Sequence, residues 1–262
     1  MEGRFARIAA PIAFGIGVLA VWQAACAGFH IPRILLPAPT AIAAAFAANL
    51  PMLGADFMQT TVRSMLPGFA IGSAAGFVVA LLVDASPFMR RGVLPVASLA
   101  GALPIVGIAP IMVMWFGFDW QSKAAVAAVM TFFPMLVNTV AGLEAPGAME
   151  RDVLRSYSAS GLQTLLKLRL PAALPYIFTA LKLNTTLALI GAIVAEFFGT
   201  PTVGMGFRIS TEAARLDLDV VWAETLLAAI TGSALFFGLA YLERNVTFWR
   251  PAFQPSTQKE LQ

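Results

Sequence analysis

Six stretches of about 20 mostly apolar residues recur along this chain, and they constrain its fold more than any other feature. A transmembrane helix needs roughly 20 such residues to cross the hydrocarbon core of a bilayer. Only 12% of the residues are charged, against about 25% in soluble domains. The sequence therefore predicts an all-α integral membrane protein with one transmembrane domain over residues 1–262. The predicted spans are residues 8–29, 64–83, 93–116, 124–143, 172–198 and 221–242.

The segment between the first two predicted spans is too polar for a membrane crossing. Residues 30–63 contain several prolines together with Asp56, Gln59 and Arg63. We expect an extended stretch followed by an amphipathic helix that lies at the membrane interface. Two arginines precede the first apolar run, as in a signal peptide, but the length of that run favours a retained span. The polar tail over residues 254–262 is predicted to be mobile.

Lysine and arginine residues are distributed unevenly between the two predicted sides of the membrane. With a cytoplasmic N-terminus, eleven lie in cytoplasmic segments, five in outer segments, and Lys182 inside the fifth span. Because basic residues concentrate on cytoplasmic loops, both termini are predicted to be cytoplasmic. This orientation places residues 144–171 in the cytoplasm and residues 200–219 outside. It also accounts for the net charge of +3 without a nucleic-acid partner.

The sequence contains no residue pattern typical of an enzyme active site. Cys26 and His30 are the only residues of their types, which excludes a disulfide within the chain and a metal site built from several histidines. No catalytic triad and no Gly-x-x-x-x-Gly-Lys-Ser/Thr phosphate loop is visible. We therefore expect a non-catalytic chain without a metal or cofactor of its own, which does not hydrolyse ATP.

One cytoplasmic stretch, SYSASGLQTLLKLRLPAALP, is too apolar for an ordinary loop and too charged for a span. Ser160 can cap a helix that begins at Gly161. Four leucines follow at helical spacing, namely Leu162, Leu165, Leu166 and Leu170. The pattern predicts a short amphipathic helix that ends at Leu170-Pro171. Because its leucines are unstable in water, this helix must pack against another part of the chain or against a partner.

This stretch resembles the cytoplasmic loop of permease subunits from bacterial binding-protein-dependent ABC importers. That loop reads Glu-Ala-Ala, then Gly, then an apolar residue followed by Leu-Pro. Aligned on Leu170-Pro171, the apolar position is Leu168 and the glycine position is Ser158. The Glu-Ala-Ala positions hold Asp152, Val153 and Leu154, so only the acidic character of the first is retained.

Further segments resemble the nitrate, taurine and sulfonate branch of the same family. They occur in order along the chain: LLPAPTAI, GALPIVGIAPIMVMWFGF, FFPMLVNTVAGL, LIGAIVAEFFG, VGMGFRI and YLERNVTFWRP. The resemblance implies a type I importer fold with six helices in the bacterial inner membrane. It also implies a dimer of permeases, two cytoplasmic ATPase subunits that hold ATP and Mg²⁺, and an extracytoplasmic substrate-binding protein.

In that family the loop forms a coupling helix, which docks in a groove of the ATPase. The resemblance implies that the stretch from Ala159 to Leu170 buries its leucines in this partner, while its basic residues face the rim or the lipid headgroups. The residues expected at the contact are Asp152, Ser158, Ala159, Ser160, Gly161, Leu162, Leu165, Leu166, Leu168, Leu170 and Pro171.

Small residues and prolines mark two of the predicted spans. Gly68, Gly72 and Gly76 recur at every fourth position of the second span, a spacing that lets helices approach closely. We expect them to serve packing, within one subunit or across a dimer. In the third span, interrupted by Pro95, Pro104 and Pro110, irregular backbone is tolerated where it is buried or lines a cavity.

The third span also borders the translocation path in the family that the sequence resembles, although a merely kinked structural helix fits the pattern equally well. Glu196 ends the fifth span, where an acid either makes a structural hydrogen bond or acts as a gate. The candidate pore-lining residues are Pro104, Gly107, Pro110, Met114, Asn138 and Glu196.

These observations favour the permease subunit of an ATP-driven importer. An ion-coupled secondary transporter is the alternative, but such folds usually show inverted repeats, and none is visible. A membrane enzyme would need a cluster of titratable groups, which only Lys182 and Glu196 approach. The apolar pore stretches, without arginine in the third or fourth span, favour an aromatic or heterocyclic solute such as a pyrimidine or vitamin precursor. Nitrate, taurine or an alkanesulfonate is the alternative.

Overall fold

Helices make up nearly all of the structure. The computed structural model describes residues 4–101, 103–199 and 202–248, and these ranges contain no strand. The first half comprises α1 (Arg4–Gly28), α2 (Pro39–Ala48), α3 (Leu50–Phe57), the π-helix η1 (Met58–Met65), α4 (Leu66–Ala85), α5 (Pro87–Ala100) and α6 (Ile105–Phe116). The second half comprises α7 (Trp120–Glu144), α8 (Ala148–Ser156), α9 (Gly161–Thr164), the π-helix η2 (Leu165–Arg169), α10 (Leu170–Glu196), α11 (Met205–Ala214) and α12 (Leu218–Val246). The predicted all-α fold is confirmed, while the predicted mobile tail lies outside the described residues.

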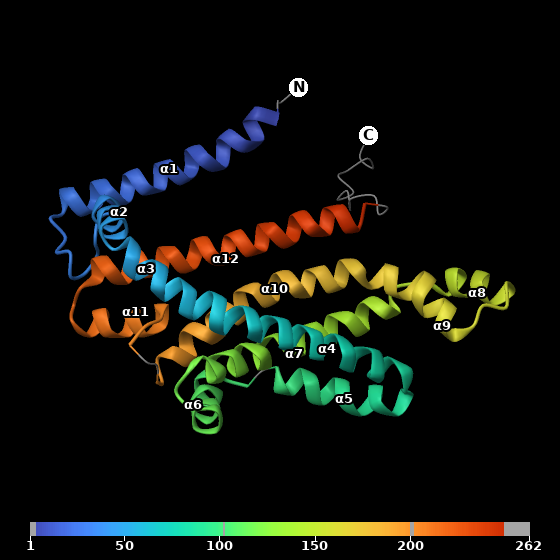
Figure 1. The fold of residues 1–262 in the computed structure, drawn as a ribbon. Coiled ribbons are helices and arrows are strands. Elements are labelled where there is room, and N and C mark those ends of the chain that lie inside the picture. The colour runs from blue at the N-terminus through green and yellow to red at the C-terminus, as the bar shows by residue number, and fades with distance from the viewer. Residues whose placement is uncertain (1–3, 102, 200–201, 249–262) are drawn as a thin grey trace.

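Within the described residues, five stretches of helix are long and apolar enough to cross a membrane. They are Ala9–Gly28, Leu50–Ala85, Trp120–Glu144, Gly161–Glu196 and Leu218–Val246. Helices α5 and α6 together make a sixth candidate, with a bend of 99° between them. The predicted third span is therefore a broken one, consistent with its prolines. Figure 1 shows α6 turned away from the direction of α5.

The centre of the molecule is the packing of α7 against α4 and α10 (Figure 1). The three glycines of α4 are buried and face α7, where no side chain would fit. A Cβ at Gly68 would lie 2.6 Å from the Cβ of Ala127, and a Cβ at Gly76 would lie 2.5 Å from the carbonyl oxygen of Phe132. Because non-bonded carbon atoms do not approach so closely, the close α4–α7 packing inside one subunit requires these glycines.

A buried amide joins the same three helices. The Nδ2 of Asn184 on α10 donates to the Oγ of Ser73 on α4 at 3.0 Å and to the carbonyl oxygen of Thr131 on α7 at 2.8 Å. Such bonds hold helices together in a medium that offers no water as an alternative partner. Asn184 is fully buried, so its amide is a structural element of the core.

The segment after the first span agrees only in part with the expected extended stretch and interfacial helix: a non-helical stretch is followed by the separate helix α2, but Asp56, Gln59 and Arg63 belong to the next helical run. Helices α3, η1 and α4 follow one another without a break over Leu50–Ala85. Asp56 and Gln59 are buried against the rest of the chain, although Arg63 is exposed. The polar residues of this segment therefore do not all face solvent, because several are paired inside the protein, and the helix that carries them continues into the second span.

The predicted end of the loop helix at Leu170-Pro171 is also wrong. Helix α9, the π-helix η2 and α10 form one continuous run over Gly161–Glu196. Pro171 stands directly after the π-helix, near the start of α10, and does not interrupt this run. The loop helix is therefore an extension of the fifth span rather than a separate element.

The two ends of the molecule carry different elements (Figure 1). Helices α8 and α9 lie at one end, which we call the α8–α9 end, and α2 and α11 lie at the other, the α11 end. Helix α12 runs from the α11 end toward the α8–α9 end. Helix α1 lies at the periphery, in contact with α2 and with α12 through Trp22 and Trp222, whose ring centroids are 5.1 Å apart.

Candidate functional site

The start of α9 is fixed by a reciprocal pair of hydrogen bonds. The Oγ of Ser160 accepts from the backbone N–H of Gln163 at 3.2 Å, and the Oε1 of Gln163 accepts from the N–H of Ser160 at 2.8 Å. This capping box satisfies donors that a helix terminus otherwise leaves free. The predicted helix start at Gly161, with Ser160 as its cap, is confirmed.

The leucines after this cap divide between two environments. Leu165 and Leu170 pack against a buried cluster that includes Leu143, Ala173 and Ile177 of the same chain. Leu162 and Leu166 instead are 64% and 54% exposed. The expectation that all the leucines of this helix are free for a partner therefore does not hold for Leu165 and Leu170, which pack where α7 ends and α10 begins.

Helix α8 adds an apolar stripe that the sequence analysis did not single out. Met149 and Val153 lie on one side of α8, Tyr157 follows four residues later as the cap of its end, and all three are exposed. The i, i+4, i+8 spacing could have revealed this stripe, but the leucines of the following helix gave a denser pattern. We call Met149, Val153, Tyr157, Leu162 and Leu166 the exposed loop face.

Ser158, at the family's glycine position, has an unusual backbone conformation. It lies between α8 and α9 with φ of 53°, in the left-handed region that favours glycine. A residue other than glycine in this region costs roughly 1 kcal/mol. The geometry thus gives a physical reason for a glycine in the motif and supports the alignment of Ser158 with that position.

Arg169 joins the loop to two spanning helices. Its Nη2 lies 2.6 Å from the Oδ1 of Asp84 at the end of α4, and its Nε donates to the carbonyl oxygen of Leu143 on α7 at 2.9 Å. The guanidinium thus binds a carboxylate and a carbonyl at the ends of two spanning helices. Because η2 also continues into α10, the loop is joined to α4, α7 and α10.

Three of the predicted pore-lining residues lie on one face of α6, counting Pro104, which caps the start of this helix. Pro104, Gly107 and Met114 are exposed, and with Ile111 they follow the 3, 4, 3 spacing of a helical stripe. The opposite side of α6 packs through Ala109 against α7 and α10. We call Pro104, Gly107, Ile111 and Met114 the α6 stripe.

Pro110 and Asn138 do not belong to the α6 stripe. Both are half-buried. The Nδ2 of Asn138 donates to the carbonyl oxygen of Pro134 one turn earlier at 2.8 Å. In an α-helix this oxygen already accepts from the backbone N–H of Asn138. A local bond of this kind needs neither solute nor partner, so the predicted pore role of Asn138 has no geometric support beyond its position.

Glu196 lies inside its own subunit and away from the α6 stripe. Its carboxylate is buried, accepts from the Oγ1 of Thr60 at 2.8 and 3.0 Å, and accepts from the backbone N–H of Gly206 at 2.7 Å. These contacts join α10, η1 and α11 near the α11 end. They favour the structural alternative for Glu196, and a gating role stays a prediction.

Glu196 is part of a larger polar network that the sequence analysis missed. Asp56 accepts from the backbone N–H of Gly204 at 2.6 Å through Oδ1 and from the Nε of Arg208 at 3.0 Å through Oδ2. Glu224 of α12 is buried next to it. On α7, Lys123 donates to the carbonyl oxygens of Phe118, at 2.6 Å, and Gly199. Together these groups fasten α11 and the ends of α7 and α10 to the rest of the chain.

The only sign of this network in the sequence is that several acidic residues occur within or next to apolar helices. The sequence places Asp56 in a polar segment outside the spans and only Glu196 within a span. Their pairing with residues more than 130 positions away along the chain could not be read from spacing. Among the described residues, no group of three or more His, Cys, Asp or Glu side chains is placed to hold a metal ion.

The spans, the broken helix pair and the exposed loop face define a multi-pass membrane protein with an exposed apolar surface at one end. Residues 68–248 match the family described as the binding-protein-dependent transport system inner membrane component. The match covers more than half of the chain, and the chain belongs to this family. It is therefore a permease component of an ABC importer in the inner membrane, in a family whose members are not catalytic.

Individual relatives agree with this assignment. A probable ABC transporter permease protein of Haemophilus influenzae is 28% identical over 90% of this chain and 96% of the relative. The formylaminopyrimidine transport permease protein ThiX of Halalkalibacterium halodurans is 28% identical over 92% of this chain and 95% of the relative. The taurine transport system permease protein TauC of Escherichia coli is 31% identical over 73% of this chain and 69% of the relative. The names of the last two relatives indicate different solutes.

Proposed function

We propose that two copies of this chain form the translocation pathway of an ATP-driven importer. A binding protein outside the membrane delivers a small solute, and two cytoplasmic ATPase subunits supply the free energy. The exposed loop face is the observation that supports this proposal most directly. It presents five apolar side chains at the predicted cytoplasmic end, where water does not stabilise them. A groove on an ATPase subunit would bury them, as in other helix-in-groove contacts.

The contacts of Arg169 suggest how the loop acts on the pathway. ATP and Mg²⁺ bind in the ATPase subunits, and closure of these subunits draws the two loops together. Arg169 ties the loop to Asp84 and to the carbonyl oxygen of Leu143, so α4, α7 and α10 follow the loop as one body. The chain itself contributes geometry to this cycle, and no chemical step takes place on it.

The α6 stripe is our candidate for the wall of the pathway. Pro104, Gly107 and Met114 are exposed in the single chain, and an exposed irregular helix at membrane depth is tolerated only beside protein or a cavity. In a two-fold dimer the same stripe of the second copy faces it across the axis. Pro110, Asn138 and Glu196 lie outside this stripe, and we propose that they stabilise the helices behind the pathway wall rather than line the pathway.

The apolar character of the α6 stripe favours an aromatic or heterocyclic solute with little charge. The formylaminopyrimidine permease among the relatives is consistent with this choice, whereas the taurine permease supports the anionic alternative. The broken third span is not free of arginine, because α5 begins at Pro87 and carries Arg90 and Arg91 directly after its first turn. The preference for a heterocycle therefore depends on α6.

The substitution Leu166→Asp tests the loop contact, with Leu166→Met as the matched control. Aspartate places a charge in an apolar groove, while methionine retains the apolar area. We expect Leu166→Asp to reach the membrane in normal amounts but to lose both the co-purified ATPase subunit and the ATP hydrolysis that depends on solute-loaded binding protein. Normal co-purification and normal solute-dependent hydrolysis in Leu166→Asp would contradict the proposal.

Calorimetry of the binding protein encoded beside the permease tests the solute. We expect heat of binding with pyrimidines or related heterocycles and none with taurine, nitrate or alkanesulfonates. The reverse result would establish the anionic alternative. Uptake by proteoliposomes that contain this chain alone, driven by an ion gradient without ATP, would instead support the secondary transporter.

A further inference from the structure

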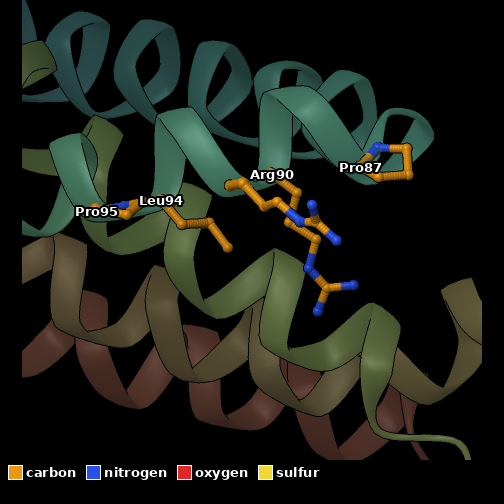
Figure 2. A pocket seen from close by; sticks show the side chains of 5 residues that line it. Pro87, Arg90, Leu94 and Pro95 are labelled. Carbon is orange, nitrogen blue, oxygen red and sulfur yellow. The ribbon is translucent and has the colours of Figure 1, made fainter.

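A cavity of about 480 Å³ opens beside the first turns of α5. It is lined by Pro87, Arg90, Arg91, Leu94 and Pro95. Figure 2 shows Arg90 between Pro87 on one side and Leu94 and Pro95 on the other. The cavity thus combines two guanidinium groups with an apolar wall. It lies at the turn between α4 and α5, close to Asp84 and therefore at the α8–α9 end.

The local electrostatics of this cavity favour an anion. The N-terminus of a helix carries a partial positive charge, which acidic residues usually complement. The first turn of α5 contains no acidic residue and is followed at once by Arg90 and Arg91. The side chain of Ser86 accepts from the N–H of Met89 at 3.4 Å and brings no charge. The positive charges of two arginines and the positive end of the helix dipole therefore coincide, although acidic rather than basic residues stabilise a helix N-terminus.

The charge of the two arginines is only half balanced within the chain. Arg90 forms an ion pair with Glu144 at the end of α7. Arg91 has no ion pair or hydrogen bond to another side chain in the part of the chain that the structure describes. Arg91 is exposed, so one positive charge beside this cavity has no acidic partner within the described part of the chain.

We propose that Arg91, assisted by Arg90, binds an oxyanion of the phosphate or sulfonate type in this cavity. A guanidinium matches two oxygens of such a group through parallel hydrogen bonds. Leu94 and Pro95 accommodate the apolar part of the same molecule. Two sources can supply this chemistry: the phosphodiester of an anionic lipid in the cytoplasmic leaflet, or an anionic solute on its way out of the pathway. The site is independent of the proposed ATPase contact.

The test uses the full-length permease purified with its associated subunits. One sample is placed in nanodiscs that contain phosphatidylcholine with one-fifth phosphatidylglycerol, and the retained phosphatidylglycerol is counted by mass spectrometry after delipidation. A second sample, free of anionic lipid, is titrated with ethanesulfonate while thermal unfolding is followed. The variants are Arg91→Gln, the charge-preserving Arg91→Lys, and Arg215→Gln, which removes an arginine charge at the α11 end.

We expect Arg91→Gln to retain phosphatidylglycerol about fivefold less tightly, the effect of one basic residue at an anionic membrane surface. Arg91→Lys should be intermediate, and Arg215→Gln should match the wild type. If ethanesulfonate rather than phosphatidylglycerol shows the dependence on Arg91, the oxyanion is that of a solute. Arg91-independent binding of both probes, or binding of neither, would overturn the proposal.

Chemical protection keeps the proposal testable even if Arg91→Gln does not fold. Phenylglyoxal modifies accessible arginines, and peptide mass spectrometry reports the modified fraction of Arg91 in the wild-type protein. Phosphatidylglycerol or ethanesulfonate should lower that fraction for Arg91 and leave Arg215 unchanged. Equal modification of Arg91 with and without both anions would contradict the site.

Discussion

Replacement of Arg169 by methionine tests whether the loop is mechanically joined to the spanning helices. Without the guanidinium, the Asp84 carboxylate loses the nitrogen 2.6 Å from its Oδ1, and the carbonyl oxygen of Leu143 loses a donor at 2.9 Å. The Asp84 side chain is only 8% exposed, so its charge would stay nearly buried without this partner. Methionine has a similar apolar stem, which separates the loss of charge from the loss of packing.

The magnitude follows from the burial of the two side chains. Removing one partner of a buried ion pair costs about 3–5 kcal/mol in the free energy of unfolding. The Arg169 side chain is 23% exposed, which brings the expected loss to the lower end of that range. The lost hydrogen bond to Leu143 adds about 1 kcal/mol. Together these effects amount to about 4 kcal/mol.

Thermal unfolding in detergent and ATP hydrolysis by the complex measure the two consequences. Soluble domains of 150–250 residues lose about 2–4 °C in Tm per kcal/mol, so Arg169→Met should lower the Tm by roughly 8–16 °C on that scale. Below both midpoints, ATP hydrolysis stimulated by solute-loaded binding protein should fall while the ATPase subunits stay bound. The double variant Asp84→Asn/Arg169→Gln removes both charges and should recover most of the Tm, because no buried charge is left unpaired.

Two outcomes would refute this reasoning. A Tm of Arg169→Met within about 2 °C of the wild type would show that the pair contributes less than about 1 kcal/mol. Full stimulation of ATP hydrolysis in a variant with a lowered Tm would show that the loop acts on the spans by another route.

The remaining predictions concern packing, backbone strain and topology. Gly76→Ala should lower the free energy of unfolding by about 1–3 kcal/mol, because its Cβ would meet α7; Gly17→Ala, whose Cβ meets nothing within 4 Å, should leave the Tm of the purified protein unchanged or slightly higher. Ser158→Gly should be neutral or stabilising, because φ of 53° suits glycine, and a lowered Tm would contradict the strain. In a cysteine-free background, Thr211→Cys should react with an impermeant thiol reagent in intact cells and Ser160→Cys only after lysis; labelling of Ser160→Cys in intact cells would reverse the orientation.

The spans could be predicted because their signal is local. An apolar run of about 20 residues is a property of the sequence itself, and so is a capping pair such as Ser160 and Gln163. The prolines that break the third span were visible for the same reason. The family resemblance likewise depended on short motifs in order, and the match over residues 68–248 confirms it.

The parts that could not be predicted depend on partners distant in the sequence. Asp56 indicated an interfacial helix because nothing nearby in the sequence announces Arg208 or the backbone of Gly204 as its partners. The continuous run through Pro171 includes a π-helix just before the proline, and no residue pattern in the sequence marks such a turn. The division of the loop leucines depends on how the loop folds back on α7 and α10, so spacing alone could not separate Leu165 from Leu166.

Site-specific photocrosslinking tests the central claim most directly, namely that the exposed loop face contacts an ATPase. A photoreactive amino acid is placed at Tyr157 or Leu166 in the full transporter in cells, with Leu183 as an exposed position within a span. Adducts are identified by the peptides of the attached protein. We predict that Tyr157 and Leu166 crosslink to a P-loop ATPase and that Leu183 does not. Absence of ATPase adducts from both loop positions, in a transporter that still purifies with its ATPase, would contradict the account.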